Sequence, residues 1–201
     1  MLIYIIYGLP VLVAGYFLVT FIFDLLLRGF VPFIPSRPWV VEQILYEMDI
    51  NKPEPIMVAL SSGRSGFFHA LEKKYPNARL IGVETDLFPF IVSKVQSWIR
   101  RTRIKVIKSS IHHVDVKKAD FIYSHLYPDK MQGLSAKFKF ECRPGTVIVS
   151  TGFNIPYLEP KKVVDLPDRK GRLDFLSKNQ NLFQRKSRLF KKEKKAYFYE
   201  I

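Results

Sequence analysis

Cysteine is almost absent from this sequence, and acidic residues are scarce. The single cysteine, Cys142, has no partner in the chain, so an intramolecular disulfide and a cysteine-based metal site are both excluded. This cysteine usage agrees with a reducing compartment. The 32 Lys and Arg residues outnumber the 18 Asp and Glu residues, which gives a formal net charge of +14. Such a surplus favours an anionic neighbour such as phospholipid, nucleic acid or an acidic protein.

Charge is nearly absent from the start of the chain. Residues 2–27 carry no charge other than Asp24, and about 20 apolar residues are enough to cross a bilayer core. A basic leader and a small-residue cleavage site, the marks of a signal peptide, are not evident. The pattern predicts an uncleaved transmembrane anchor over residues 1–28. The basic residues that follow predict a single-pass membrane protein whose soluble domain faces the cytoplasm or an equivalent interior compartment.

The rest of the chain divides into a linker and one domain. Residues 29–38 (GFVPFIPSRP) are expected to form a Pro-rich linker. Residues 39–201 are long enough for one domain with its own core. Their last part, residues 161–201, holds 13 Lys or Arg against 5 Asp or Glu. This basic part is either a solvated loop between the last strands or a patch that binds anionic lipid or an acidic partner.

Short apolar runs alternate with helical patterns along the domain. Strands are expected at residues 56–60, 79–83, 103–107, 119–124, 146–150, 162–166 and 196–201. Helices are expected at residues 39–49, 67–75, 87–101 and 129–141. This alternation predicts an α/β fold, with a mostly parallel seven-stranded sheet and helices on both faces. No helical pattern separates the last two strands, so an antiparallel pair is expected at one edge.

The carboxyl ends of the first two expected strands suggest a ligand site. The turn after the first strand, residues 61–66 (SSGRSG), is small enough for close approach of a ligand. Glu84 ends the second strand at about the spacing from Gly63 expected of an acid that binds ribose hydroxyls. Together they favour a nucleoside-type ligand. The turn alone would also fit an ordinary strand-to-helix connection, and Asp86 is suited to be a helix N-cap.

Several segments go beyond this general pattern and resemble a known family. They are residues 31–36 (VPFIPS) with Trp39-Val40-Val41, Gly82-Val83-Glu84, residues 119–123 (ADFIY) with 126–131 (LYPDKM), and residues 144–150 (PGTVIVS) with Phe153 and Ile155-Pro156. The chain resembles, from about Phe30 to Tyr157, the small membrane-anchored protein lysine methyltransferases related to the mitochondrial ATP synthase c-subunit lysine methyltransferase and their prokaryotic relatives. The resemblance implies a Rossmann-like class I methyltransferase fold, S-adenosylmethionine as cofactor and a lysine of a membrane protein as substrate.

The resemblance also assigns site residues. It implies a cofactor site made of Leu60, Ser61, Ser62, Gly63, Arg64, Glu84 and Ser110. It implies a substrate site made of Phe33, Pro35, Leu126, Tyr127 and Pro128. Tyr127 is a candidate to orient the target amine and His125 to accept a proton, although ordinary packing at a strand end would also explain both. No metal site is expected, since His112-His113 has no acid or cysteine at ligand spacing.

The first loop departs from the family pattern. Ala59 stands where an acid is usual, Ser61 and Ser65 replace two glycines, and an acid is missing near Ser109-Ser110. Arg64 is either a partner of the cofactor carboxylate or a surface charge. Two alternatives therefore remain beside the enzyme: a catalytically inactive, membrane-tethered binding module with this fold, and, on charge alone, a nucleic-acid-binding protein.

Overall fold

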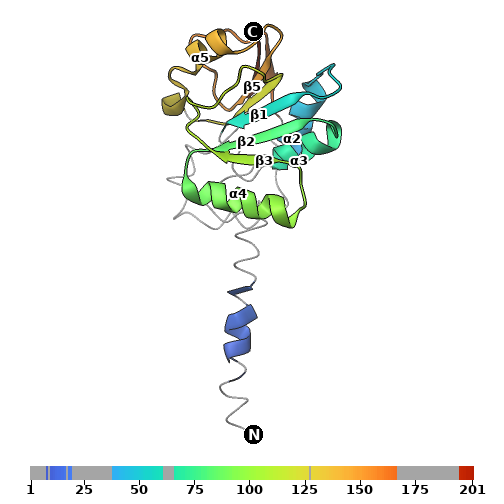
Figure 1. Cartoon of the computed structure of the whole chain (residues 1–201), viewed down its shortest axis with the longest axis vertical. Helices are drawn as coiled ribbons and strands as arrows, with labels where there is room; N and C mark the ends of the chain where they lie inside the picture. The colour runs from blue at the N-terminus through green and yellow to red at the C-terminus, as the bar shows by residue number, and fades with distance from the viewer. Residues whose placement is uncertain are drawn as a thin grey trace.

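The chain was analysed as a computed structural model (Figure 1). The structure describes residues 8, 10–16, 18–19, 38–60, 66–126, 128–166 and 195–201. The Pro-rich linker, the turn at 61–65 and most of the basic part at 161–201 lie outside the described residues.

The membrane prediction requires correction. Among the residues that the structure describes, no helix is both long and apolar enough to span a bilayer. Residues 10–16 are helical, but a membrane span needs about 20 apolar residues in one helix. The predicted localisation, a single-pass membrane protein with its domain in the cytoplasm or an equivalent compartment, is contradicted by this finding. Most of the predicted anchor over residues 1–28 lies outside the described part of the chain.

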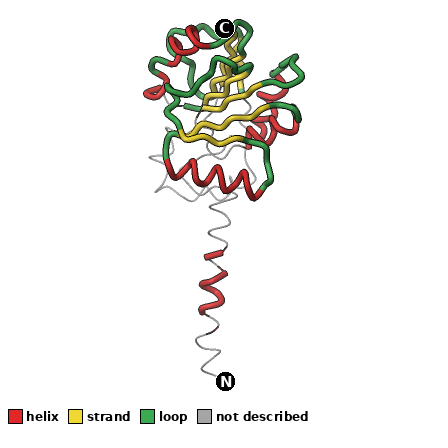
Figure 2. The backbone as a smooth tube through the Cα atoms, in the orientation of Figure 1, coloured by secondary structure: helices red, strands yellow, loops and turns green. Residues whose placement is uncertain are grey.

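The domain is built on the predicted seven-stranded sheet, with the strand order β3-β2-β1-β4-β5-β7-β6. The strands are β1 (Ile56–Leu60), β2 (Arg79–Glu84), β3 (Lys105–Lys108), β4 (Phe121–Ser124), β5 (Val147–Thr151), β6 (Lys162–Asp165) and β7 (Lys195–Glu200). The first five strands are parallel, and β7 pairs antiparallel with both β5 and β6. The mostly parallel sheet and the antiparallel edge are therefore confirmed. Figure 2 shows the sheet with its covering helices.

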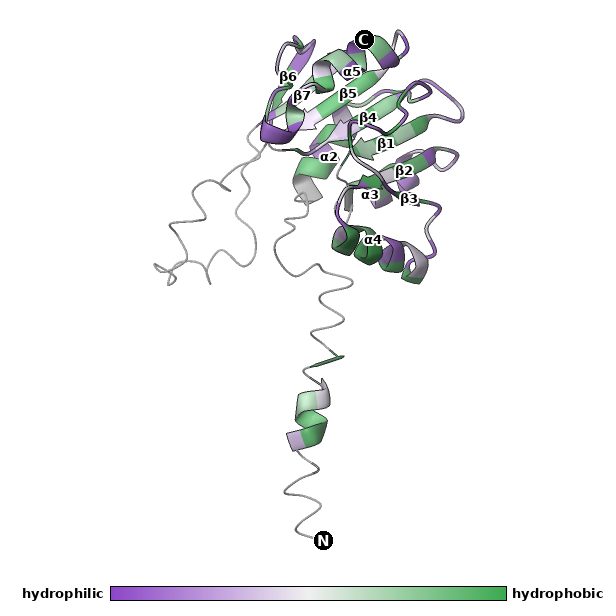
Figure 3. Cartoon of the chain, turned by 60° about the vertical axis from the view of Figure 1, so that its left-hand side comes forward, coloured by the Kyte–Doolittle hydropathy of each residue, from purple (hydrophilic) through white to green (hydrophobic). Residues whose placement is uncertain are grey.

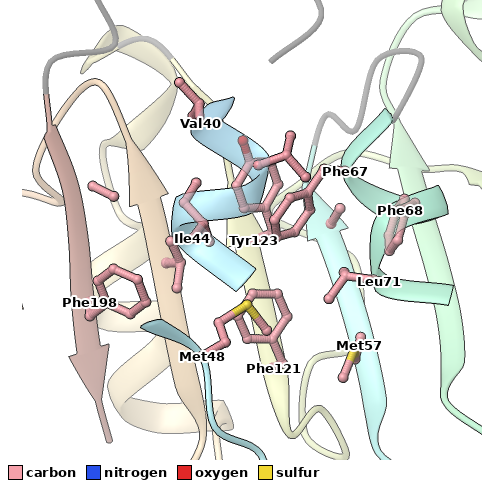
Figure 4. Close-up of a cluster of buried hydrophobic side chains, with 14 of the residues drawn as sticks. Val40, Ile44, Met48, Met57, Phe67, Phe68, Leu71, Phe121, Tyr123 and Phe198 are labelled. Carbon is pink, nitrogen blue, oxygen red and sulfur yellow. The ribbon is translucent and has the colours of Figure 1, made fainter. Parts of the chain in front are cut away.

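Two helices cover one face of the sheet. They are α2 (Pro38–Glu47) and α3 (Gly66–Lys74), which pack against each other. Ile44 of α2 and Phe68 of α3 are fully buried in this layer with Phe121 of β4. Figure 4 shows the side chains of both helices gathered over the strands. Strands buried on both faces explain why β1 and β4 read as continuous apolar runs in the sequence.

The opposite face packs against α5 (Leu134–Glu141) and the segment between β3 and β4. Leu134 and Phe138 of α5 are fully buried with Ile122 and Ile148 of the sheet. The sequence predicted one helix over residues 129–141. The structure instead has a 3-10 turn, η2 (Pro128–Met131), and begins α5 after Gly133, whose φ of 77° is left-handed and interrupts a helix. The remaining helix, α4 (Leu87–Ile99), packs against β2 and β3.

An ion-paired aspartate holds the amino ends of the central strands together. Asp120, which precedes β4, accepts hydrogen bonds from the Ile56 N–H (2.9 Å), Lys52 Nζ (2.6 Å) and Arg143 (2.9 Å). Burial alone would raise the pKa of Asp120, but these donors outweigh burial and hold the pKa below its usual value. The side chain therefore fixes the beginnings of β1 and β4 to the turn that leads into β5.

Candidate active site

The polar residues of the site lie at the carboxyl ends of the parallel strands. Register places Leu60 of β1 beside Ser124 of β4, and Ser124 beside Ser150 of β5. Leu60 also pairs with Val83, the residue before Glu84. In open α/β sheets this edge is where ligands bind. The predicted cofactor residues Leu60 and Glu84 are thus brought together by strand pairing.

Glu84 is a buried carboxylate at the end of β2. Its residue is 2% exposed, and Ser93 Oγ of α4 lies 3.4 Å from Glu84 Oε1. A buried carboxylate is costly unless hydrogen-bond donors surround it. Ser93 supplies one donor, and the hydroxyls of a bound ligand would supply more. The geometry therefore fits the predicted role of Glu84 in holding a ribose.

The segment after β3 is tied to the same edge. The N–H of Ser109 donates to the Glu84 carbonyl oxygen (3.0 Å). Ser110, a predicted cofactor residue, is half-buried, and its Oγ accepts from the His112 N–H at 3.3 Å. The Ser110 carbonyl oxygen accepts from His113 and Val114. Ser110 therefore follows a residue that is hydrogen-bonded to Glu84. The Ser110 side chain stabilises the turn that follows by accepting the His112 N–H.

Ser124 provides a test of whether the site suits a polar ligand. Its hydroxyl is completely buried at the end of β4 and has no hydrogen-bond partner within the described part of the chain. Unsatisfied buried hydroxyls cost free energy, so a group of this kind in a native fold calls for a partner. A polar ligand at the carboxyl edge would satisfy it. Glu84 and Ser124 together fit a nucleoside-bearing cofactor.

A second polar group lies on the other side of the sheet, at the ends of β4 and β5. Thr151 Oγ1 is 2.7 Å from His125 Nδ1 and 3.2 Å from the Tyr123 hydroxyl. Burial lowers the pKa of His125, and the contact with Thr151 opposes this shift only in part. Burial therefore disfavours the charged form of this imidazole. Thr151 fixes one of its ring nitrogens.

An aromatic stack connects this group to the start of α3. The Phe67 and Tyr123 rings have centroids 4.0 Å apart and planes inclined by 23° (Figure 4). Phe67 follows the predicted cofactor turn, and Leu60 precedes it; both are buried. The two ends of that turn are consequently held against the strand that carries His125. Ser61, Ser62, Gly63 and Arg64 lie outside the described residues.

The predicted substrate residues are only partly described. Leu126 is buried in the core under α5, and Pro128 is exposed at the start of η2. Phe33, Pro35 and Tyr127 lie outside the described residues. Sequence reasoning missed Ser93, Ser124 and Thr151. A signal existed for two of them, because neighbouring parallel strands that both end in hydroxyl residues place those hydroxyls at one edge.

Comparison with known proteins adds independent findings. Residues 60–162, just over half of the chain, match the family model described as the ANTKMT methyltransferase domain. A protein-lysine N-methyltransferase of Saccharolobus islandicus (strain REY15A) is 24% identical over 140 residues, which cover 69% of this chain and 86% of that protein.

Solved structures agree with the architecture. An RNA methyltransferase from Salinibacter ruber, in complex with S-adenosyl-L-homocysteine, superimposes with a TM-score of 0.65 at 18% identity, covering 84% of this chain and 94% of that one. A geranyl diphosphate C-methyltransferase from Streptomyces coelicolor A3(2) gives a TM-score of 0.62 at 12% identity, covering 80% and 77%. At these identities the likeness concerns the fold, which is the predicted Rossmann-like methyltransferase fold.

Proposed function

Because the chain belongs to the ANTKMT methyltransferase domain family, we propose that it methylates the ε-amine of a lysine in a protein. It is an S-adenosylmethionine-dependent methyltransferase, and the lysine substrate is our proposal. The observation that supports a lysine substrate is the similarity, over 69% of the chain, to a protein-lysine N-methyltransferase. The fold neighbours act on chemically different substrates and do not decide between them.

S-adenosylmethionine, when bound, supplies a methyl group activated by a sulfonium centre. Leu60, Glu84 and the segment at Ser109-Ser110 would hold it, since strand pairing and the Ser109–Glu84 hydrogen bond gather them at one edge. Ser124 would offer its buried hydroxyl. The predicted turn residues Ser61, Ser62, Gly63 and Arg64 remain part of this proposal.

The residues of the chain have to bind the substrate lysine with its amine uncharged. A protonated amine has no lone pair, so a site that disfavours positive charge makes the lysine a better nucleophile. His125 suits this task because its pKa is lowered by burial, so it places no cation at the end of β4. We propose that His125 accepts a hydrogen bond or proton from the amine, and that Tyr127, two residues further along the chain, orients the amine.

The test is methyl transfer from radiolabelled S-adenosylmethionine to a lysine-rich acceptor protein by the full chain. A parallel sample of the acceptor is acetylated on its lysines, and a third reaction offers RNA instead. Label on the native acceptor, absent from the acetylated one and mapped to lysine by mass spectrometry, supports the proposal. Glu84→Gln serves as the variant with impaired cofactor binding, and Glu159→Gln, an exposed carboxylate, is its matched control.

Two outcomes would contradict the proposal. Label that appears on RNA and not on protein would show that the chain is a methyltransferase whose substrate is RNA and not a protein lysine. Folded protein that binds neither S-adenosylmethionine nor S-adenosylhomocysteine would instead favour the inactive binding module, for which the replacement of an acid by Ala59 is the supporting observation.

A further inference from the structure

Helix α4 exposes large apolar side chains to solvent, while two of its four buried residues, Ser93 and Gln96, are polar and the other two are Pro89 and Val92. The Gln96 side-chain nitrogen has no hydrogen-bond partner within the described part of the chain. Its exposed residues include Trp98, which is 79% exposed. A surface helix of a globular protein normally exposes polar residues on its outer side. The outward face of α4 is therefore built for an environment other than water.

The exposed apolar residues form one continuous surface. Leu87, Ile91 and Trp98 are spaced so that they share one side of the helix, and Phe88 and Ile99 flank them on the same side. All five side chains are at least 44% exposed. Figure 3 shows α4 as a strongly hydrophobic helix on the outside of the domain. We refer to these five residues as the α4 apolar face.

Basic residues outnumber acids around this face, where the exposed N-cap Asp86 is the acid next to Leu87. Residues 87–108 contain six Lys or Arg residues and no Asp or Glu. Lys94 lies on the same side of the helix as Trp98, and Arg100 and Arg101 follow its last turn. Lys105 and Lys108 are exposed on β3, the edge strand next to α4. Apolar and basic side chains on one surface suit a layer that is apolar inside and anionic at its boundary.

We propose that the α4 apolar face rests on an anionic lipid surface, with the apolar side chains in the acyl region and the basic ones at the headgroups. Helices that lie in the membrane interface have this combination of an apolar side with Trp, Phe or Leu and adjacent Lys and Arg. Tryptophan is favoured at that depth because its ring is apolar and its N–H is polar. Such peripheral contact needs no spanning helix and is independent of the proposed substrate.

A second copy of this chain fits the surface less well. Two copies joined through α4 would bring two sets of basic residues together, on chains that each carry a formal charge of +14. Like charges at close range oppose association. An anionic lipid surface instead attracts each of these basic residues.

The test uses Trp98 as its own reporter. The chain contains two tryptophans, so Trp39→Phe in the full-length protein leaves only Trp98. Vesicles of phosphatidylcholine and phosphatidylglycerol are prepared with and without brominated acyl chains, which quench tryptophan on contact. We expect the emission of Trp98 to shift to the blue on binding and to be quenched by the brominated vesicles. A local reporter is needed because other apolar parts of the chain can also attach it to a vesicle.

A matched control places the reporter elsewhere. Phe140 on α5 is 89% exposed, and α5 and α4 lie at opposite ends of the domain (Figures 1 and 3). Phe140→Trp, with Trp39→Phe and Trp98→Phe, should keep the emission of a water-exposed tryptophan and escape quenching. Lys94→Glu with Arg101→Glu should weaken the quenching response of Trp98 by roughly tenfold or more in lipid concentration.

Three results would overturn the proposal. The first is Trp98 that stays in water while the protein sediments with the vesicles. The second is an equal response to vesicles of phosphatidylcholine alone, which would remove the role of negative charge. The third is a blue-shifted Trp98 without lipid that depends on protein concentration, which would make a second copy the occupant of the α4 apolar face.

Discussion

The amino and carboxyl ends of the central strands differ in how their buried polar groups are hydrogen-bonded. At the amino ends, Asp120 accepts hydrogen bonds from three donors in two other segments of the chain. At the carboxyl ends, the Ser124 hydroxyl is buried without a partner among the described residues, and Glu84 is buried at the end of β2. One end thus stabilises the fold through internal pairing. The other end holds Ser124 and Glu84 where the proposed cofactor would bind, and that difference can be tested.

The largest effect is expected from Glu84 at the carboxyl ends. Glu84→Ala should weaken S-adenosylhomocysteine binding by about 3 kcal/mol, roughly a hundredfold, because a buried charged acceptor is lost. Isothermal calorimetry measures this directly. Glu84→Gln keeps the size of the side chain and one acceptor. Its affinity should therefore lie between those of Glu84→Ala and the original chain. Affinity in Glu84→Ala equal to that of the original chain would remove Glu84 from the site.

The matching change at the amino ends should affect stability and not binding. Asp120→Ala should lower the free energy of unfolding by about 2 kcal/mol, chiefly because the half-buried Ile56 N–H loses its acceptor. The half-exposed Lys52 and Arg143 pairs add little of their own. Urea denaturation measures the loss, with Asp115→Ala as a control at an exposed aspartate. Weakened cofactor binding in folded Asp120→Ala protein would show that the two ends are not independent.

The Asp120 interaction also has a defined pH dependence. Its pKa is lowered in the folded protein, so the stability it contributes is fully present above the ordinary aspartate value. That contribution is lost as the pH falls below about 4 and through the lowered pKa. In Asp120→Ala this part of the acid-induced loss should disappear from the urea data.

A smaller effect is expected from Thr151, which holds His125. Thr151→Val keeps the shape but removes the hydroxyl that contacts His125 Nδ1 and the Tyr123 hydroxyl. We expect kcat to fall about tenfold, corresponding to about 1.4 kcal/mol, with little change in cofactor affinity. Thr151→Ser should restore most of the rate. A loss of cofactor binding in place of kcat would assign Thr151 to the cofactor site.

The smallest effect is a pH dependence of stability carried by His125. Burial lowers its pKa, so below about 6.5 the unfolded chain takes up a proton that the folded chain resists. The free energy of unfolding should therefore decrease as the pH falls from about 6.5 toward the lowered pKa. Above about pH 6.5, His125 should add no pH dependence. His125→Gln should flatten this slope. His69→Gln is the comparison, since burial also lowers the pKa of His69.

Local patterns were enough to predict most of the fold. The strand β1 was predicted with its observed bounds, because an apolar run between turn residues has few alternatives. The α4 prediction ended two residues late, since helix termini depend on the carbonyl partners of the last turn. The helix expected over residues 129–141 was wrong at Gly133, where the left-handed backbone interrupts it.

The candidate site was less accessible from sequence. Glu84 was predicted at the end of a strand, as found, because spacing along one chain segment was sufficient. The contact between His125 and Thr151 joins two different strands, so it depends on the β4–β5 register, which residue patterns do not specify. The Asp120 interactions join three segments that are distant in sequence. The outward apolar side of α4 was missed because hydrophobic spacing does not say which side faces the core.

The placement of β7 between β5 and β6 bears on the order in which the domain is assembled. Within the described part of the chain, strand β6 is hydrogen-bonded only to β7, so we expect it to enter the sheet together with that later segment. Contacts between distant segments form slowly, because loop closure precedes their stabilisation. We therefore expect β1 to β5 to pair before β7 does, which leaves the edge of β5 open until β7 is added. In that state a chaperone, or another β5 edge, would find the backbone groups that β7 later occupies.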